Sequence, residues 1–390
     1  MTARPVVATG LGAVGPWGTD LAALSAGLSA GRPLAAPIGD GVAALVPDVD
    51  LSPWLPAASA RRLGRPSRWA VAAARIALEH AGLKSFEGRR VAVVLATSFG
   101  AVLFTEKLVH QILIDGPESA QPFYFSECVA NAAAAQVALA LGATGANVTV
   151  TQREAGPLVA LARGTAEVAE GRADLALVGS ADEMTPLLHG VLERFRAIAR
   201  EFPRPFDVGR SGALAGEGAS ILVLEPEADA ATRKATWRVR ITGTASAFDP
   251  SASESDWGGG DEPLARGVAR TLARAGRGMD GIDRIVSGAS GTLRGDRLEA
   301  RVLSRARGSA RPPAVVVPKA VTGEYGGGFL AAAFLAATGV AFGKITALSE
   351  TEPGLDVVVH DGSPLPAPRA VLASALAAGG AGAWAVLERA

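Results

Sequence analysis

Short stretches of β-branched residues alternate along the chain with longer amphipathic stretches that are rich in alanine and leucine. In the first half of the chain, this pattern predicts strands over 6–10, 91–96, 147–151, 175–179 and 221–224, and helices near 67–82, 101–114, 131–142 and 157–170. Pro157 falls at the first position of the last helix, where the missing N–H of proline leaves no hydrogen bond unmade. Such alternation is typical of strands that are connected through helices in a largely parallel sheet.

The segment 225–234 mixes acidic and basic residues and is interpreted as a linker, after which the same alternation starts again. The second half predicts strands over 237–243, 284–288, 314–317, 357–360, 370–373 and 383–387, and helices over 263–275, 296–307 and 327–340. The order of elements in 236–390 echoes the order in 1–230. We therefore expect a duplicated α/β unit with an N-terminal half over 1–230 and a C-terminal half over 236–390. The apolar, alanine-rich stretch 329–342 is expected to form a helix inside the protein.

The chain carries 38 basic and 38 acidic residues, which give a formal net charge of zero. A general binder of nucleic acid or of anionic membranes is not expected from this balance. No run reaches the ~18 apolar residues of a spanning helix. The first residues lack the charged head and long apolar stretch of a signal peptide. We expect a cytoplasmic protein whose partners include neither nucleic acid nor membrane.

Reactive side chains are scarce in this sequence. Cys128 is the single cysteine, so no intramolecular disulfide can form. We expect this thiol to be buried and inert. The four histidines show no ligand spacing, and the expectation is that the protein holds neither a metal nor a cofactor. They are His80, His110, His189 and His360.

Three segments resemble motifs of the β-ketoacyl synthase (ketosynthase) family of the thiolase superfold. They are TGLGAVGPWG over 9–18, GRADLALVGSADE over 171–183 and RPFDVGRSGALAGEGASILVLE over 204–225. Weaker echoes continue through Gly295-Asp296, Lys319 with Thr322-Gly323, and Gly379-Gly380, so the resemblance covers nearly the whole chain. It implies a duplicated five-layer αβαβα fold with two central mixed sheets, and a dimer.

In that family, a cysteine at a strand-to-helix elbow takes an acyl chain from acyl carrier protein, and two histidines support the decarboxylation of a malonyl unit. Counting seventeen residues back from Gly171 puts Glu154 at the cysteine's position. The Gly295-Asp296 anchor puts Gly288 at the first histidine. The second histidine is replaced by Glu324 in KAVTGE, where Lys319 is retained. The resemblance therefore implies that all three catalytic positions are degenerate.

These substitutions change the chemistry that the site can perform. Acyl transfer to Glu154 would give a mixed anhydride, which is much higher in free energy than a thioester. As a charge, the carboxylate suits the N-terminus of the helix from Pro157, where unpaired N–H groups favour an anion. Arg153 is a candidate ion-pair partner for it. Without the histidines, no donor remains for a developing oxyanion.

This pattern resembles the chain length factor, a ketosynthase-like subunit of type II polyketide synthases, although glutamine is more usual there than glutamate. The resemblance implies a noncatalytic protein that forms a heterodimer with an active ketosynthase and shapes the tunnel for a polyketide chain carried by acyl carrier protein. Phe99 falls where family members vary the depth of this tunnel. Phe123 and Tyr124 fall on the loop before the interface helix. Rigid rings would form a firm end wall for an apolar chain.

Several alternatives stay open at this point. The chain can instead be a ketosynthase-like malonyl-carrier-protein decarboxylase, or another acyl-processing enzyme, with Glu154 as base. A condensing enzyme that uses Cys128 and a scaffold that touches no substrate are two further hypotheses. The aromatic residues Phe99, Phe123 and Tyr124 can equally serve ordinary packing.

Overall fold

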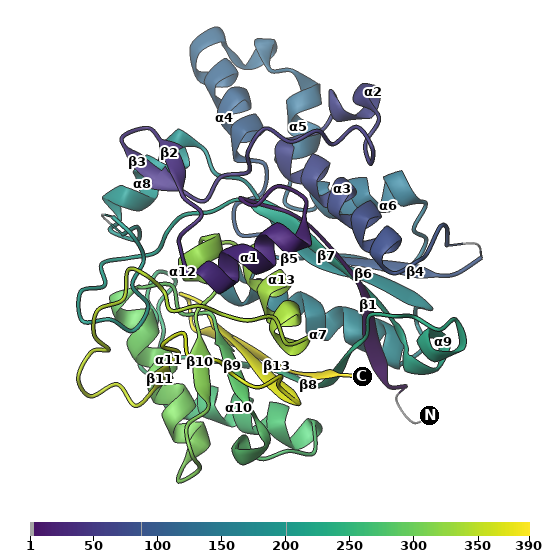
Figure 1. Cartoon of the computed structure of the whole chain (residues 1–390). Helices are drawn as coiled ribbons and strands as arrows, with labels where there is room; N and C mark the ends of the chain where they lie inside the picture. Colours follow the sequence, from purple (N-terminus) through teal and green to yellow (C-terminus); the bar gives the residue numbers. More distant parts are fainter. Residues whose placement is uncertain (1–3, 87, 200) are drawn as a thin grey trace.

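The computed structural model describes residues 4–86, 88–199 and 201–390 (Figure 1). Within this part of the chain, eleven strands form one continuous sheet in the order β11-β10-β9-β12-β13-β8-β1-β7-β6-β4-β5, and β2 and β3 form a separate pair.

The first half contains β1 (Val6–Val14), α1 (Leu21–Ala30), β2 (Ala36–Ile38), β3 (Gly41–Ala43), α2 (Ala57–Ala60), α3 (Arg65–His80), β4 (Val91–Ala96), α4 (Val102–His110), the π-helical turn η1 (Gln111–Asp115), the 3-10 turn η2 (Pro117–Ser119), α5 (Pro122–Cys128), α6 (Ala132–Leu141), β5 (Asn147–Val150), the 3-10 turn η3 (Arg153–Ala155), α7 (Gly156–Ala169), β6 (Leu175–Asp182), α8 (Pro186–Arg194), β7 (Gly218–Pro226) and α9 (Glu227–Thr232).

The second half repeats the α/β alternation. It contains β8 (Val239–Phe248), α10 (Asp261–Arg274), the 3-10 turn η4 (Met279–Gly281), β9 (Arg284–Ser287), α11 (Leu293–Arg307), β10 (Ala314–Val316), α12 (Lys319–Thr322), α13 (Gly326–Ala337), β11 (Val358–Val359), β12 (Ala370–Leu376) and β13 (Ala381–Arg389).

The two halves share one strand order. In the first half the order is β5-β4-β6-β7-β1, and in the second it is β10-β9-β12-β13-β8, with β11 added at the edge. In each half the first three strands of this order pair in parallel and the later pairs are antiparallel. The two sheets join only where Val7 and Ala8 of β1 pair with Arg240 and Val239 of β8. The expected duplicated fold with two mixed sheets is therefore confirmed, whereas the boundary at 230 and 236 stays a prediction.

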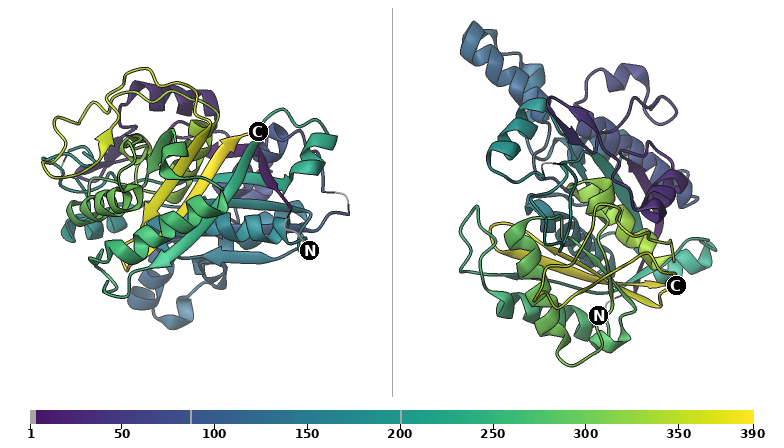
Figure 2. Two further views of the ribbon diagram at one scale, coloured as in Figure 1. Left: turned by 90° about the horizontal axis from the view of Figure 1, so that it is seen from below. Right: turned by 60° about the vertical axis from the view of Figure 1, so that its left-hand side comes forward.

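Five layers follow from the packing of helices on these sheets (Figures 1 and 2). Helix α3 covers the outer face of the first sheet, with α6 packed on α3 and β4, and α10 covers the outer face of the second sheet, with α11 packed on α10. Helices α7 and α13 lie between the sheets and contact strands of both halves. All twelve residues of α13 are buried, which confirms the interior helix expected from its apolar sequence.

The first glycine motif lets β1 and α3 approach closely. A Cβ atom on Gly10 would lie 2.1 Å from the Ala77 carbonyl oxygen, and one on Gly12 would lie 2.1 Å from that of Ala73. No side chain fits in either place, so these glycines serve close backbone packing.

Two interpretations of local sequence were wrong. The segment 225–234 is not a free linker, because β7 runs to Pro226 and α9 follows directly. Glu225 is buried there and accepts hydrogen bonds from Arg233. Phe123 and Tyr124 lie on α5 rather than on a loop, because Pro122 starts a helix whose aromatic rings pack on Phe104.

Residues 1–3 of the expected N-terminal half lie outside the described residues. Among the described helices, none has the length and apolar character needed to cross a membrane.

Candidate functional site

The predicted elbow is present between β5 and α7. Strand β5 ends at Val150, η3 turns the chain, and α7 begins at Gly156. Arg153 adopts a positive φ of 46° in this turn, a conformation that non-glycine residues rarely take. The turn η3 contacts β12, β13 and α13, so the second half of the chain closes over Glu154.

Lys319 and Glu324 form an ion pair beside this elbow. The lysine side chain is 1% exposed, and its Nζ lies 2.6 Å from Glu324 Oε1. The ammonium also lies 5.4 Å from the centre of the Phe329 ring. The glutamate is held by its backbone, because its N–H donates to the Leu214 carbonyl at 2.6 Å. The retained lysine is thus already neutralised by a carboxylate of its own chain.

Glu154 keeps its proton to a higher pH than an ordinary glutamate does. Burial raises the pKa of its carboxyl to about 7, helped by the negative charge of Glu324 and opposed by Lys319 and Arg153. Its Oε2 atom is buried without a hydrogen-bond partner. The expectation of a carboxylate stabilised at the helix N-terminus was therefore wrong, since the cost of desolvation exceeds the effect of the helix end. Arg153 is exposed and, within the described residues, forms no ion pair with Glu154.

Gly288, at the position predicted to match the first histidine, leaves no space for a side chain. It directly follows β9, and its N–H donates to the Ser374 carbonyl at 2.7 Å. A Cβ atom would lie 2.9 Å from that carbonyl oxygen and 3.0 Å from Ala375 Cα. These neighbours are backbone atoms of β12, so an imidazole here would require the strand to move.

Glu299 is a further buried carboxyl that sequence reasoning missed. It lies on α11 at 2% exposure and accepts a hydrogen bond from Ser287 Oγ at 2.9 Å. Burial raises its pKa to about 7, and Lys319 acts in the opposite direction. The sequence offered one signal for Glu299, because this residue follows Asp296 of the Gly295-Asp296 motif by three positions.

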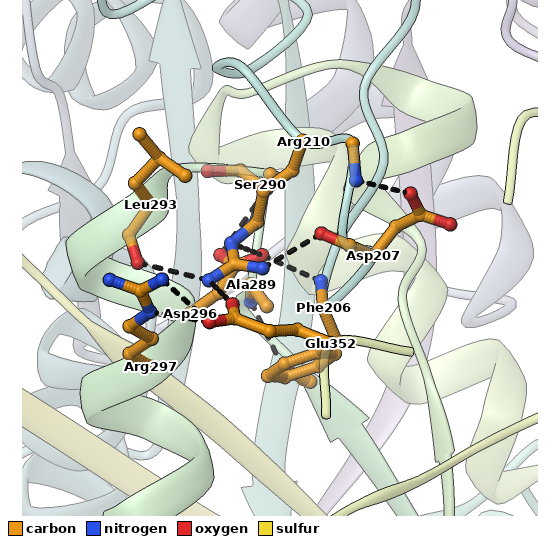
Figure 3. A network of polar contacts seen from close by, with 12 residues as sticks. Phe206, Asp207, Arg210, Ala289, Ser290, Leu293, Asp296, Arg297 and Glu352 are labelled. Atoms are coloured by element: carbon orange, nitrogen blue, oxygen red, sulfur yellow. Dashed lines mark hydrogen bonds and ion pairs between the residues drawn. The ribbon is translucent and has the colours of Figure 1, made fainter. Parts of the chain in front are cut away.

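The first part of the strongest sequence motif, at Phe206, Asp207 and Arg210, belongs to a structural network rather than to the elbow (Figure 3). The Arg210 guanidinium is fully buried and pairs with Glu352 and, at 3.9 Å, with Asp296. It also donates to the Asp207 carbonyl at 2.7 Å. Asp296 accepts from the Phe206 N–H at 2.8 Å. Because Asp296 lies in the first turn of α11, this network connects the first half of the chain to the second.

The three aromatic candidates separate into two places. Phe123 and Tyr124 pack around the buried Phe104, with ring centres 5.6 Å and 5.3 Å from it. Phe99 lies in the turn after β4 and is 45% exposed. Neither place is among the segments that surround Glu154 most closely.

Cys128 and the histidines belong to other parts of the fold. Cys128 ends α5 and is half-buried rather than fully buried, with its thiol donating to the Tyr124 carbonyl at 3.0 Å. His80 contacts Leu11, while the other three histidines lie on α8, on α4 and next to β11. In the described residues, no group of three or more histidine, cysteine, aspartate or glutamate side chains is placed to hold a metal ion.

Comparisons with known proteins identify this architecture as the thiolase-like ketosynthase fold. The structure of the ishigamide ketosynthase/chain length factor matches with a TM-score of 0.90 and 30% identity over the full length of both chains. Nodulation protein E of Rhizobium meliloti (strain 1021) is 31% identical over 322 residues, or 78% of each chain. The 3-oxoacyl-[acyl-carrier-protein] synthase 2 of Coxiella burnetii is 29% identical over 346 residues, covering 83% of this chain and 82% of that protein.

The family model for the N-terminal domain of β-ketoacyl synthases matches residues 3–230. The chain belongs to the β-ketoacyl synthase family.

Proposed function

We propose that this chain is a noncatalytic chain length factor that forms a heterodimer with an active ketosynthase. In that complex it shapes the tunnel for the growing polyketide chain during decarboxylative Claisen condensation of malonyl units on acyl carrier protein. One observation carries the proposal: the positions that match the family's cysteine and two histidines hold Glu154, Gly288 and Glu324.

The surroundings of these positions support the absence of condensing chemistry. Glu324 neutralises the Lys319 ammonium, so this cation is not free to bind a malonyl carboxylate or a developing oxyanion. Glu154 is largely a neutral acid below pH about 7 and is a poor acyl acceptor. The packing at Gly288 removes the space that an imidazole would need.

An exposed apolar surface supports a protein partner. The hairpin formed by α4, η1 and α5 projects from the body of the fold (Figure 2). Its exposed apolar residues, the hairpin surface, are Val109, Ile112, Leu113, Ile114, Phe123, Phe125 and Val129. Leu113 and Ile114 are 74% and 70% exposed at its tip. Apolar patches of this kind mark sites of association, and the unpaired edge of β5 provides a second such feature.

The test of partner binding is co-expression with the ketosynthase encoded beside this chain. We expect a stable heterodimer in size-exclusion chromatography, and we expect Leu113→Asp with Ile114→Asp to abolish it. Val358→Asp is the matched control, because Val358 is exposed on β11 at the opposite edge of the sheet. Recovery of the double variant in full complex would refute the assignment of this surface.

The test of tunnel shaping is the product length of that heterodimer. Phe99→Ala and Tyr124→Ala are each expected to lengthen the products made from malonyl-acyl carrier protein, measured by mass spectrometry. Unchanged product length in both variants would exclude a chain length factor and leave the scaffold hypothesis.

One observation favours a second candidate, a ketosynthase-like malonyl-carrier-protein decarboxylase. A carboxyl with a pKa of about 7 suits a general base at neutral pH. This candidate expects the purified chain alone to release CO2 from malonyl-acyl carrier protein, and it expects Glu154→Gln to abolish the release. Absence of CO2 release by the unmodified chain would remove it.

A further inference from the structure

The turn that carries Phe99 lies between two parallel strands whose carboxyl ends meet. Strand β4 pairs with β6 so that Ala96 faces Ser180, and the turn over 97–100 follows β4 directly. Helix α4 then begins at Val102 without any side chain capping it from its own N-cap residue. The N–H groups of this turn, which have no acceptor within the helix, therefore need acceptors from elsewhere in the chain.

Asp182, the last residue of β6, supplies these acceptors. Its Oδ1 accepts hydrogen bonds from the Phe99 N–H at 3.1 Å, from the Ser98 N–H at 2.7 Å and from Thr97 Oγ1 at 3.0 Å. Thr97 Oγ1 in turn accepts from the Gly100 N–H at 2.9 Å. A single carboxylate oxygen thus fixes the backbone on both sides of Phe99.

The second oxygen of Asp182 faces the interior helix. Oδ2 lies 3.5 Å from Ser180 Oγ, and the backbone of Gly326, at the start of α13, also hydrogen-bonds to the carboxylate. A Cβ atom on Gly326 would lie 2.5 Å from Pro157 Cγ, so the start of α13 packs tightly on the first turn of α7. Asp182 therefore links the Phe99 turn to the start of α13, which packs on the helix that follows the elbow.

The carboxylate is held by hydrogen bonds alone. Asp182 is 1% exposed and forms no ion pair within the described residues. Arg65, the nearby cation, pairs instead with Glu183 and Glu217. A buried carboxylate is stable only when donors surround it, so the geometry of the turn and the position of Asp182 determine each other.

We propose that Asp182 is a positioning residue that sets product length by holding Phe99 in place. This inference rests on the proposed function, because it assigns a consequence to Phe99 within the tunnel. The hydrogen bonds from 97–100 fix where the Phe99 side chain leaves the backbone. Loss of these hydrogen bonds lets the Phe99 ring vary in position, so the end wall of the tunnel no longer has one fixed place.

The experiment measures product lengths of the heterodimer with Asp182→Asn. An asparagine keeps one oxygen acceptor but turns an N–H₂ group toward the donors at Ser180 and Gly326. We expect at least a twofold rise in the ratio of longer to main products at equal amounts of complex. Thr97→Val, which removes the hydroxyl but keeps the volume, is expected to move the ratio in the same direction and provides a second variant if Asp182→Asn folds poorly.

Asp174→Asn is the matched control. Asp174 lies at the other end of β6 and accepts a hydrogen bond from the Arg90 N–H at 2.8 Å, so it has the same kind of contact far from Phe99. We expect its products to match those of the unmodified complex. Equal ratios for Asp182→Asn, Thr97→Val and Asp174→Asn would overturn the inference.

A double variant distinguishes action through Phe99 from a general loss of structure. If Asp182 works by holding the ring, Asp182→Asn adds no further change in a Phe99→Ala background. A full additional shift in that background would refute the positioning role. Phe99→Ala and Tyr124→Ala both without any effect of their own would instead refute the proposed function, so the two failures are distinguishable.

Discussion

The Arg210 network and the elbow both bury charged groups between the two halves of the chain, yet the charged groups have different ion-pair and hydrogen-bond partners in the two places. Around Arg210, the guanidinium meets two carboxylates, and Asp296 accepts three backbone N–H groups. Around Glu154, Lys319 pairs with Glu324, and one oxygen atom each of Glu154 and Glu324 is buried without a hydrogen bond. Both regions contain buried atoms without a hydrogen bond, among them Arg210 Nε and Glu352 Oε2 in the first. They differ in charge pairing, because both carboxylates near Arg210 pair with its guanidinium, whereas Glu154 has no ion-pair partner among the described residues.

The largest effect is expected from Arg210→Met. This change leaves Asp296 buried without its cation, and breaking one partner of a buried pair costs about 3–5 kcal/mol. Urea unfolding measures the loss in the free energy of unfolding. Arg297→Ala is the control, because Arg297 reaches the same Glu352 from an exposed position and should have a small effect. Equal losses for both variants would contradict the view of Arg210 as the joint between the halves.

A smaller loss is expected from Glu324→Gln, about 1–3 kcal/mol, because it removes the neutralising charge from a lysine that is 1% exposed. Lys319→Met combined with Glu324→Gln should lose less than the sum of the two single variants, since the pair disappears together. Strict additivity in the unfolding measurements would show that the two side chains do not interact.

Glu154→Gln is expected to stabilise the protein at high pH. The folded pKa is about 7 and the ordinary value is 4.5, so the unmodified protein loses stability as the pH rises between these two values. The variant lacks this loss, and its advantage grows from near zero below pH about 4.5 to about 1–3 kcal/mol above pH about 7. Glu324, Lys319 and Arg153 are the charged groups that act on Glu154.

Thermal unfolding between pH 4 and 9 checks this advantage. Glu170→Gln, at the exposed far end of α7, is the control and should show no such trend. An advantage of Glu154→Gln that is constant with pH would contradict the neutral-acid description.

The smallest effect is expected from Cys128→Ala, about 1 kcal/mol in stability with product formation by the heterodimer unchanged. The thiol makes one hydrogen bond to the Tyr124 carbonyl and lies on a helix that packs against α4 and α6. Loss of condensation in this variant would support the hypothesis that Cys128 is a nucleophile.

The sequence was sufficient where periodicity and spacing decide the structure. The apolar run predicted α13, and counting from Gly171 placed Glu154 in the elbow. The sequence was not sufficient where contacts between segments that are distant in the chain determine the structure. The raised pKa of Glu154 comes first from burial and then from the charge of Glu324, whose segment pairs with Ala215.

The errors in local structure have a similar origin. The aromatic residues of α5 were expected on a loop, but they pack onto Phe104 of α4. The charges of 225–234 suggested an exposed linker, but Glu225 is buried against Arg233. In both cases a partner that is not adjacent in sequence determines the structure, and residue type alone does not reveal it.

Under the proposed function, the packing at Gly288 makes the barrier to condensing chemistry steric as well as chemical. A thiol at 154 and an imidazole at 324 are single exchanges of side chains, but a histidine at 288 needs backbone atoms of β12 at Ser374 and Ala375 to withdraw. Because β12 pairs with both β9 and β13, that withdrawal would disturb the centre of the second sheet. Under the proposed function, a histidine at this position therefore requires a rearrangement of the sheet in addition to a change of side chain.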